Sequence, residues 1–188
     1  MKRIILGSNS PRRRELLAGL DIDFTVDTGN TFEETPQPGL EAHEVPVYLS
    51  KGKSHGFHRP LDHDEVLITS DTVVILDRTV LGKPHSRADA VRMLRMLSGR
   101  AHEVVTAVTI RDCAHEETFS DSTRVHFSEL TQAEIDHYID QYKPYDKAGA
   151  YGIQEWIGYV GISAIEGSFY NVMGFPVHRV WQALQRFL

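Results

Sequence analysis

The sequence is poor in cysteine, because Cys113 is the only one among 188 residues. A single cysteine cannot form an intramolecular disulfide, which excludes the small extracellular proteins that such bonds hold together. The residues around it, from Asp112 to His115, are typical of a turn and offer neither a helix start nor a basic cluster to activate a thiol. We therefore expect a reducing compartment and no catalytic cysteine.

Long apolar runs and an excess of basic residues are missing as well. No apolar run is long enough for a transmembrane helix, and the run after Met1-Lys2-Arg3 is too short for a signal peptide. We therefore expect a cytoplasmic protein without a membrane partner. The net charge of −6 argues against the basic face that nucleic-acid binding needs. An anionic ligand would require a local cluster of positive charge.

What the chain does contain is enough apolar residues for a full core. At 188 residues and 41% hydrophobic content, it is most simply one domain spanning residues 1–188, without internal repeats or linkers. Short β-branched runs alternate with helical patterns along the chain. Strands are predicted over 4–6, 24–26, 66–70, 73–76, 79–81, 102–110, 117–127 and 159–165. Helices are predicted over 11–20, 46–56, 86–97, 131–142 and from 174 to the end.

Three of these expectations are specific enough to be tested by the structure. The apolar run 66–70 is expected to end at Asp71, so that this carboxylate would lie between two strands. Two capping boxes, at Ser86 and at Thr131, are expected to open their helices. The last helix should bury one apolar stripe, made of Val177, Val180, Trp181, Leu184 and Leu188.

The segment from Ser8 to Leu17 organises the chemistry of the chain. Ser10 suits the N-cap and Pro11 the first position of a helix, which places Arg12, Arg13 and Arg14 in its first turn. Cations are unfavourable there, since the helix dipole is positive at this end. A phosphate held by free N–H groups, serine hydroxyls and guanidinium groups would compensate for them. The alternative is a capped surface helix with solvated arginines.

Two further segments have complementary chemistry. Asp71 and Lys83 flank the paired β-branched runs, and Asp146, Lys147 and Gln154 lie in a glycine-bearing loop. Cations suit a polyphosphate, and carboxylates suit a hard divalent ion and the activation of water. The set points to phosphoanhydride chemistry, and the alternative is a scatter of salt bridges at element ends. His55, His58 and His63 lack the spacing of a zinc site, so we interpret their segment as a solvated loop.

These segments resemble the signature blocks of the Maf family of nucleoside triphosphate pyrophosphatases, which are historically linked to septum formation. The blocks follow the family order over nearly the whole chain: 8–17, 70–74, 82–84, 98–108, 146–154 and 167–176. Lys53 takes the place of a family lysine, although the neighbouring Lys51 leaves the register open. Glu155-Trp156 departs from the small residues expected after Gln154.

The resemblance implies an α/β fold of the Maf and ITPase type, with a mixed, strongly bent sheet flanked by helices and two lobes around a deep cleft. It implies hydrolysis of a nucleoside triphosphate to the monophosphate and pyrophosphate, a house-cleaning activity linked to arrest of cell division. Asp71 would be the catalytic base, and Mg²⁺ or Mn²⁺ would be held by Asp71 and by Glu33 or Glu34. The implied substrate-binding residues are Ser8, Arg12, Arg13, Lys53 and Lys83. Arg13 and Lys83, at element ends, are expected to be exposed cations that the fold does not need.

The resemblance also implies the base. Arg12, Thr72 and Gln154 match the branch acting on dTTP and UTP, whereas the branch acting on 7-methyl-GTP has Trp, Gln and Glu there. An amide can both donate to and accept from a neutral pyrimidine edge. The sequence leaves open whether modified pyrimidine triphosphates are substrates and whether the chain forms a homodimer. The rival hypothesis is a regulator of septum formation that senses nucleotides without hydrolysing them.

Overall fold

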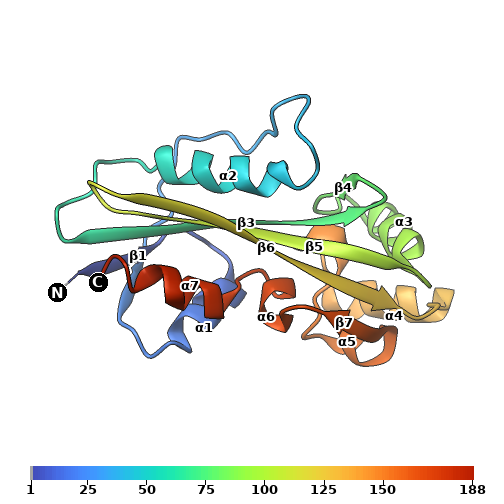
Figure 1. Cartoon of the computed structure of the whole chain (residues 1–188). Coiled ribbons are helices and arrows are strands. Elements are labelled where there is room, and N and C mark those ends of the chain that lie inside the picture. The colour runs from blue at the N-terminus through green and yellow to red at the C-terminus, as the bar shows by residue number, and fades with distance from the viewer. Residues whose placement is uncertain (1) are drawn as a thin grey trace. The chain divides into compact units, whose positions relative to one another are not determined.

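The computed structural model describes residues 2–188 as a mixed α/β protein with a seven-stranded sheet and helices on its faces (Figure 1). The strands are β1 (Arg3–Leu6), β2 (Phe24–Val26), β3 (Glu65–Leu76), β4 (Thr79–Leu81), β5 (Ala101–Arg111), β6 (Glu116–Phe127) and β7 (Ile162–Glu166). Their order is β2-β1-β3-β5-β6-β7, and β4 pairs with β3. β1 is parallel to both of its neighbours, whereas the β3–β4 and β6–β7 pairs are antiparallel.

Residues 2–188 also form seven α-helices and one 3₁₀ turn, of which the last two helices follow the last strand. They are α1 (Pro11–Ala18), α2 (Glu44–His55), α3 (Arg87–Leu97), α4 (Gln132–Tyr142), η1 (Ala148–Ala150), α5 (Trp156–Gly161), α6 (Phe169–Val172) and α7 (Val177–Leu184). Among residues 2–188, none of the helices combines the length and the apolar character needed to cross a bilayer.

The chain divides into two compact units. Unit 1 comprises Met1–Asp71, Thr106–Asp121 and Gly174–Leu188, and unit 2 comprises Thr72–Val105 and Ser122–Met173. Because the divisions fall inside β3, β5 and β6, each of these long strands contributes residues to both units. The cleft expected between two lobes stays a prediction.

Within unit 1, β1 and β3 are buried on both faces. On one face, side chains of β1, β3 and β5 pack against α1 and α7. On the other, Ile5 and Leu67 pack with Phe57 and Leu61, on the side where α2 lies in Figure 1. Residues that alternate along a strand point to opposite faces, which explains why both β1 and β3 are almost continuously apolar.

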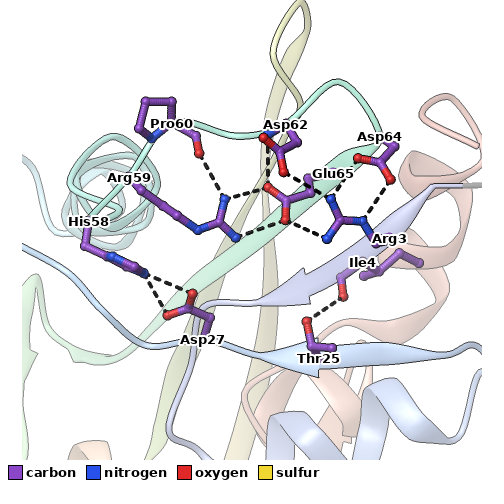
Figure 2. A network of polar contacts seen from close by, with 10 residues as sticks. All are labelled: Arg3, Ile4, Thr25, Asp27, His58, Arg59, Pro60, Asp62, Asp64 and Glu65. Carbon is purple, nitrogen blue, oxygen red and sulfur yellow. Dashed lines mark hydrogen bonds and ion pairs between the residues drawn. The ribbon is translucent and has the colours of Figure 1, made fainter.

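A network of charged side chains holds the first residues of β1 and β3 together (Figure 2). Arg3 donates to Asp64 at 2.8 and 2.9 Å, and Arg59 donates to both oxygens of the buried Glu65 at 2.7 and 2.9 Å. The Arg3 guanidinium lowers the pKa of Asp64 to about 2. His58 Nε2 lies 3.0 Å from Asp27 Oδ2, so this histidine makes a polar contact within unit 1.

Unit 2 has its own core around α3 and α4. Side chains such as Leu94, Leu97, Ile135 and Ile139 are fully buried there. Both helices begin at the predicted N-cap: the hydroxyl of Ser86 accepts from Asp89 N, and the reciprocal bonds of Thr131 and Glu134 are both present. The predicted capping box is complete only at Thr131, because the Asp89 carboxylate accepts from His85 N instead of from the N-cap residue. Asp77 and Arg78, both with positive φ, form the tight turn between β3 and β4.

Three predictions about elements were wrong. The runs 66–70 and 73–76 form one strand, so that Asp71 lies inside β3, because β-branched residues on both sides continue the ladder through it. Residues 159–161 end helix α5 and only 162–166 form a strand. In the last helix, Val180 and Leu184 are buried as expected, but Trp181 and Leu188 are exposed by 40% and 57%. The apolar stripe is therefore narrower than predicted.

Candidate active site

In unit 1, the site begins at the start of α1, which forms as its sequence predicts. Ser10 is the N-cap, and its hydroxyl accepts from the backbone N–H of Arg13 at 3.4 Å. Pro11 occupies the first helical position, where its missing N–H costs nothing. The hydroxyl of Ser8 accepts from Ser10 N at 3.2 Å, and Ser8 is buried. Arg12 is half-buried and Arg14 is exposed in the same turn.

The guanidinium of Arg13 is bound into the fold. It donates to the carbonyl of Gly174 at 2.9 Å, to the carbonyl of Ser70 at 3.0 Å and to the Ser8 hydroxyl at 3.3 Å. Desolvation by burial lowers the pKa of Arg13, and the neighbouring Asp71 carboxylate acts in the opposite direction. The expectation of an exposed cation was wrong here, because two carbonyls need this donor. Arg13 links the start of α1 to the residue before Asp71.

Asp71 and Lys53 form a nearly buried ion pair. Lys53 Nζ lies 2.8 Å from Asp71 Oδ1, and the two side chains are exposed by only 14% and 12%. Leu67, Thr69 and Asp71 alternate along β3 and therefore share the face that α2 covers. Of the two lysines between which the sequence left the register open, Lys53 contacts Asp71 and Lys51 is exposed.

Hydroxyl groups fix α2 against β3 close to this pair. The carbonyl of Ser50 accepts from Thr69 Oγ1 at 2.9 Å, and the Ser50 hydroxyl lies 2.9 Å from Thr109 Oγ1 and 3.3 Å from the Thr69 carbonyl. All three residues are buried. Buried hydrogen bonds of this kind define one position for a helix, whereas apolar contacts alone allow it to slide. Lys53, one turn further along α2, is positioned by them.

The loop before α2 brings a second carboxylate to Lys53. Glu34 Oε2 lies 2.9 Å from Lys53 Nζ, whereas Glu33 contributes its backbone carbonyl to Thr35 N. The ring of Phe32 lies directly on Gly52, where an added Cβ would be 2.2 Å from Phe32 Cζ. Gly52, which weakened the prediction of this helix, is therefore the contact point at which the loop packs.

The donor set of Asp71 and Glu34 fits a divalent ion that also uses ligand oxygens. Both carboxylates contact one ammonium group, so they face a common point. Within residues 2–188, no group of three or more histidine, cysteine or acidic side chains could hold a metal by itself. Mg²⁺ commonly needs only one or two carboxylates when phosphate oxygens complete its coordination.

In unit 2, the structure joins the segments of Lys83 and Gln154. Gly149 N donates to the carbonyl of Gly82 at 3.0 Å, beside the exposed Lys83. Gly149 has a φ of +68°, and an added Cβ would lie 2.9 Å from Val74 of β3. Only glycine allows this left-handed turn and close approach together. Lys83 makes no ion pair within residues 2–188, in agreement with the predicted exposed cation.

The two remaining predicted specificity residues of unit 2 are Thr72 and Gln154, both half-buried. Gln154 Oε1 is buried and lacks a hydrogen-bond partner in the part of the chain that the structure describes. A buried acceptor without a hydrogen bond lowers the stability of the folded protein until a donor binds to it. Thr72 follows Asp71 directly in β3.

Sequence reasoning missed two polar residues near these groups. The Ser70 hydroxyl, next to Asp71, is buried without a hydrogen-bond partner in residues 2–188. Tyr138 of α4 is fully buried, and its hydroxyl accepts from Gly152 N at 3.0 Å. An apolar pattern that contains a tyrosine is a weak signal, because most such rings simply fill a core.

Known proteins are similar to this chain over nearly its whole length. The family described as "Maf-like protein" matches residues 3–187. A dTTP/UTP pyrophosphatase of Porphyromonas gingivalis is 51% identical over 187 residues, which are 98% of this chain and 94% of that protein. One of Phocaeicola vulgatus is 49% identical over 98% of this chain and 95% of its own. The solved structure of a HAM1 protein from Coxiella burnetii has a TM-score of 0.52 at 12% identity, covering 99% of this chain and 100% of that one, and supports the fold alone.

Proposed function

The chain belongs to the Maf family, and we propose on this basis that it hydrolyses dTTP and UTP to the monophosphate and pyrophosphate. The observation that carries the proposal is the Lys53–Asp71 pair, a carboxylate held inside a strand beside cationic groups. A phosphoanhydride carries several negative charges, and its hydrolysis needs both cations and a base for water.

In the proposed reaction, Asp71 accepts a proton from a water molecule. The water oxygen forms a bond to the α-phosphorus, the bond from this phosphorus to the bridging oxygen breaks, and pyrophosphate leaves. Lys53, Lys83 and the guanidinium groups of α1 stabilise the negative charge of the triphosphate. Among the residues that the structure describes, Ser8 accepts in both of its hydrogen bonds, so its own proton is available for a phosphate oxygen.

A divalent ion completes this proposal. Asp71 and Glu34 would hold Mg²⁺ or Mn²⁺, and Glu33 is the alternative to Glu34. When bound, the ion would neutralise part of the phosphate charge and keep Asp71 from repelling the substrate. The pairing of both Asp71 and Glu34 with Lys53 supports this choice of carboxylates.

Base recognition is assigned to Gln154, with Arg12 and Thr72. The acceptor of the Gln154 amide is buried and lacks a partner within residues 2–188, so a ligand N–H would remove an existing cost. Uracil and thymine offer an N–H beside a carbonyl, which one amide can satisfy on both atoms.

The experiment that tests the proposed function is a panel of nucleoside triphosphates incubated with the protein and Mg²⁺. Added inorganic pyrophosphatase converts released pyrophosphate to phosphate, which malachite green detects. We expect release from dTTP and UTP. A protein that binds these nucleotides without releasing pyrophosphate would be the sensor of the rival hypothesis.

A further inference from the structure

The amide of Gln154 lies in a confined position whose walls belong to its own loop. A Cβ added to Gly152 would lie 3.1 Å from Gln154 Nε2, 3.2 Å from Gln154 Oε1 and 3.0 Å from Cε of Lys147. The amide therefore rests against the backbone of residue 152, and its orientation depends on how residues 152–155 are held.

One hydroxyl group holds both ends of this four-residue turn. Tyr138 OH accepts from Gly152 N at 3.0 Å and donates to the carboxylate of Glu155. Glu155 N in turn donates to the Gly152 carbonyl at 3.0 Å. Tyr138 is fully buried in α4, so its ring cannot follow a moving loop. Ile153 and Gln154 lie between the two clamped residues.

Glu155 also ties this turn to the beginning of the loop. Its second oxygen lies 3.2 Å from Lys147 Nζ, which is 2.8 Å from Asp146. The Lys147 side chain is exposed by only 8%, and a buried cation requires such partners. The glutamate that departs from the small residues expected at this position is thus the residue on which Tyr138 and Lys147 converge.

We propose that Tyr138 and Glu155 are positioning residues that fix the orientation of the Gln154 amide and thereby set the choice between uracil and cytosine. This inference rests on the proposed function, in which Gln154 contacts the base. Uracil presents a carbonyl beside an N–H, and cytosine presents an amino group beside a bare nitrogen. An amide rotated by half a turn exchanges its donor and acceptor, so it fits cytosine as well as it fitted uracil. Selectivity therefore needs an amide that cannot rotate.

Loss of the clamp has two expected consequences. The side chain would have to be ordered by the ligand, which weakens binding of the base. The rotated amide would also become accessible, which favours CTP relative to UTP. Neither consequence concerns the triphosphate, whose proposed contacts lie elsewhere in the chain.

The test compares wild type, Tyr138→Phe, Glu155→Gln and the matched control Tyr142→Phe. Tyr142 stacks on Tyr138 at a ring distance of 5.2 Å and is 39% exposed. Specificity constants are measured for UTP, dTTP and CTP, and inorganic tripolyphosphate serves as a competitive inhibitor that has no base. Melting temperatures are recorded alongside.

For Tyr138→Phe we expect kcat/KM for UTP to fall by about tenfold, mainly through KM, and the UTP-to-CTP ratio to fall by a similar factor. Glu155→Gln should act in the same direction, because an amide offers one acceptor to two donors. If Tyr138→Phe does not fold, Glu155→Gln provides the test. Inhibition by tripolyphosphate should stay unchanged in both variants, and Tyr142→Phe should resemble wild type.

An unchanged UTP-to-CTP ratio, or parallel losses for nucleotides and tripolyphosphate, would overturn the inference and leave the two residues structural. Gln154→Ala separates this failure from failure of the proposed function. If Gln154→Ala abolishes the preference for UTP while Tyr138→Phe and Glu155→Gln retain it, only the inference is wrong. If Gln154→Ala leaves the preference intact, Gln154 does not contact the base and the proposed recognition is wrong.

Discussion

Lys53 Nζ lies 2.8 Å from Asp71 Oδ1, in a pair that is almost withdrawn from water. A carboxylate inside an apolar strand would be costly if it were alone, and the lysine makes it tolerable. The same lysine contacts Glu34, so the three charges act as one group. In the proposed reaction, a triphosphate at Asp71 would meet this cation at the same place.

Asp71→Asn should abolish turnover and change nucleotide affinity by no more than about tenfold, or roughly 1.4 kcal/mol. The amide keeps the shape of the side chain but cannot accept the proton of water. Turnover by the malachite green assay and affinity by calorimetry check this. Asp23→Asn, at an exposed position of the same unit, is the control. Near-normal turnover in purified Asp71→Asn would exclude its role as base.

Lys83→Ala and Arg13→Ala should both impair hydrolysis but differ in stability. Lys83 is exposed, and its truncation should change stability by less than about 0.5 kcal/mol. Arg13→Ala leaves the carbonyls of Ser70 and Gly174 without this donor and should cost about 1–3 kcal/mol. Thermal unfolding with steady-state kinetics separates the two. Equal melting temperatures would contradict the bridging role of Arg13.

Gly52→Ala should lower activity without a matching loss of helix stability. Alanine favours a helix interior over glycine by about 1 kcal/mol, but its methyl group would displace the ring of Phe32. Displacement of Phe32 moves the loop that carries Glu34. We expect a higher Mg²⁺ concentration for half-maximal activity and a melting temperature close to wild type. Lys51→Ala, at an exposed position of the same helix, is the control and should leave the Mg²⁺ requirement unchanged.

His102 should make the protein less stable as the pH falls. Burial lowers the pKa of His102 to about 4, and its Nε2 lies 2.6 Å from the hydroxyl of the buried Tyr151. The pKa of His102 is lower in the folded than in the unfolded state. The free energy of unfolding that depends on a neutral His102 is therefore fully present above about pH 6.5 and is lost as the pH falls towards 4. This part of the free energy of unfolding is roughly 3 kcal/mol.

Chemical denaturation between pH 7.5 and 4.5 measures this dependence. His102→Gln should flatten it, whereas His115→Gln, at an exposed position, should not. An unaltered slope in His102→Gln would show that other groups cause the acid sensitivity.

Base choice should follow the three residues Arg12, Thr72 and Gln154. We expect dTTP and UTP to be hydrolysed at least about tenfold more efficiently than 7-methyl-GTP, which corresponds to about 1.4 kcal/mol in transition-state binding. A methylated guanine is cationic and favours an aromatic face and a carboxylate, neither of which these residues supply. Parallel specificity constants for dTTP, UTP, CTP, GTP and 7-methyl-GTP decide the matter. A preference for the methylated purine would overturn the assignment.

Local signals predicted much of the fold. Ser10, Ser86 and Thr131 cap their helices as expected, because a cap depends only on residues three positions apart. The continuity of β3 through Asp71 could not be predicted, because an acidic residue favours a break unless a partner neutralises it. That partner, Lys53, is 18 positions away in the chain.

Of the candidate site, too, the sequence predicted one part and not the other. Residue types and their order identified the segments, but not the contacts that each side chain makes. Whether Glu33 or Glu34 contacts Lys53 depends on how Phe32 packs on Gly52, which is a tertiary contact. The buried hydroxyl of Tyr138 was not distinguishable from an ordinary core tyrosine.

The placement of Asp71 and Thr72 on one uninterrupted strand limits how this protein could change its substrate during evolution. A single peptide bond joins the proposed base to a residue proposed to select the nucleobase. An inserted or deleted residue at this point would reverse the facing of every later side chain of the strand. New substrate preferences can therefore arise by exchange of side chains at fixed positions of this strand, but not by changes in the length of the strand. Families that diversify through loops have no such restriction.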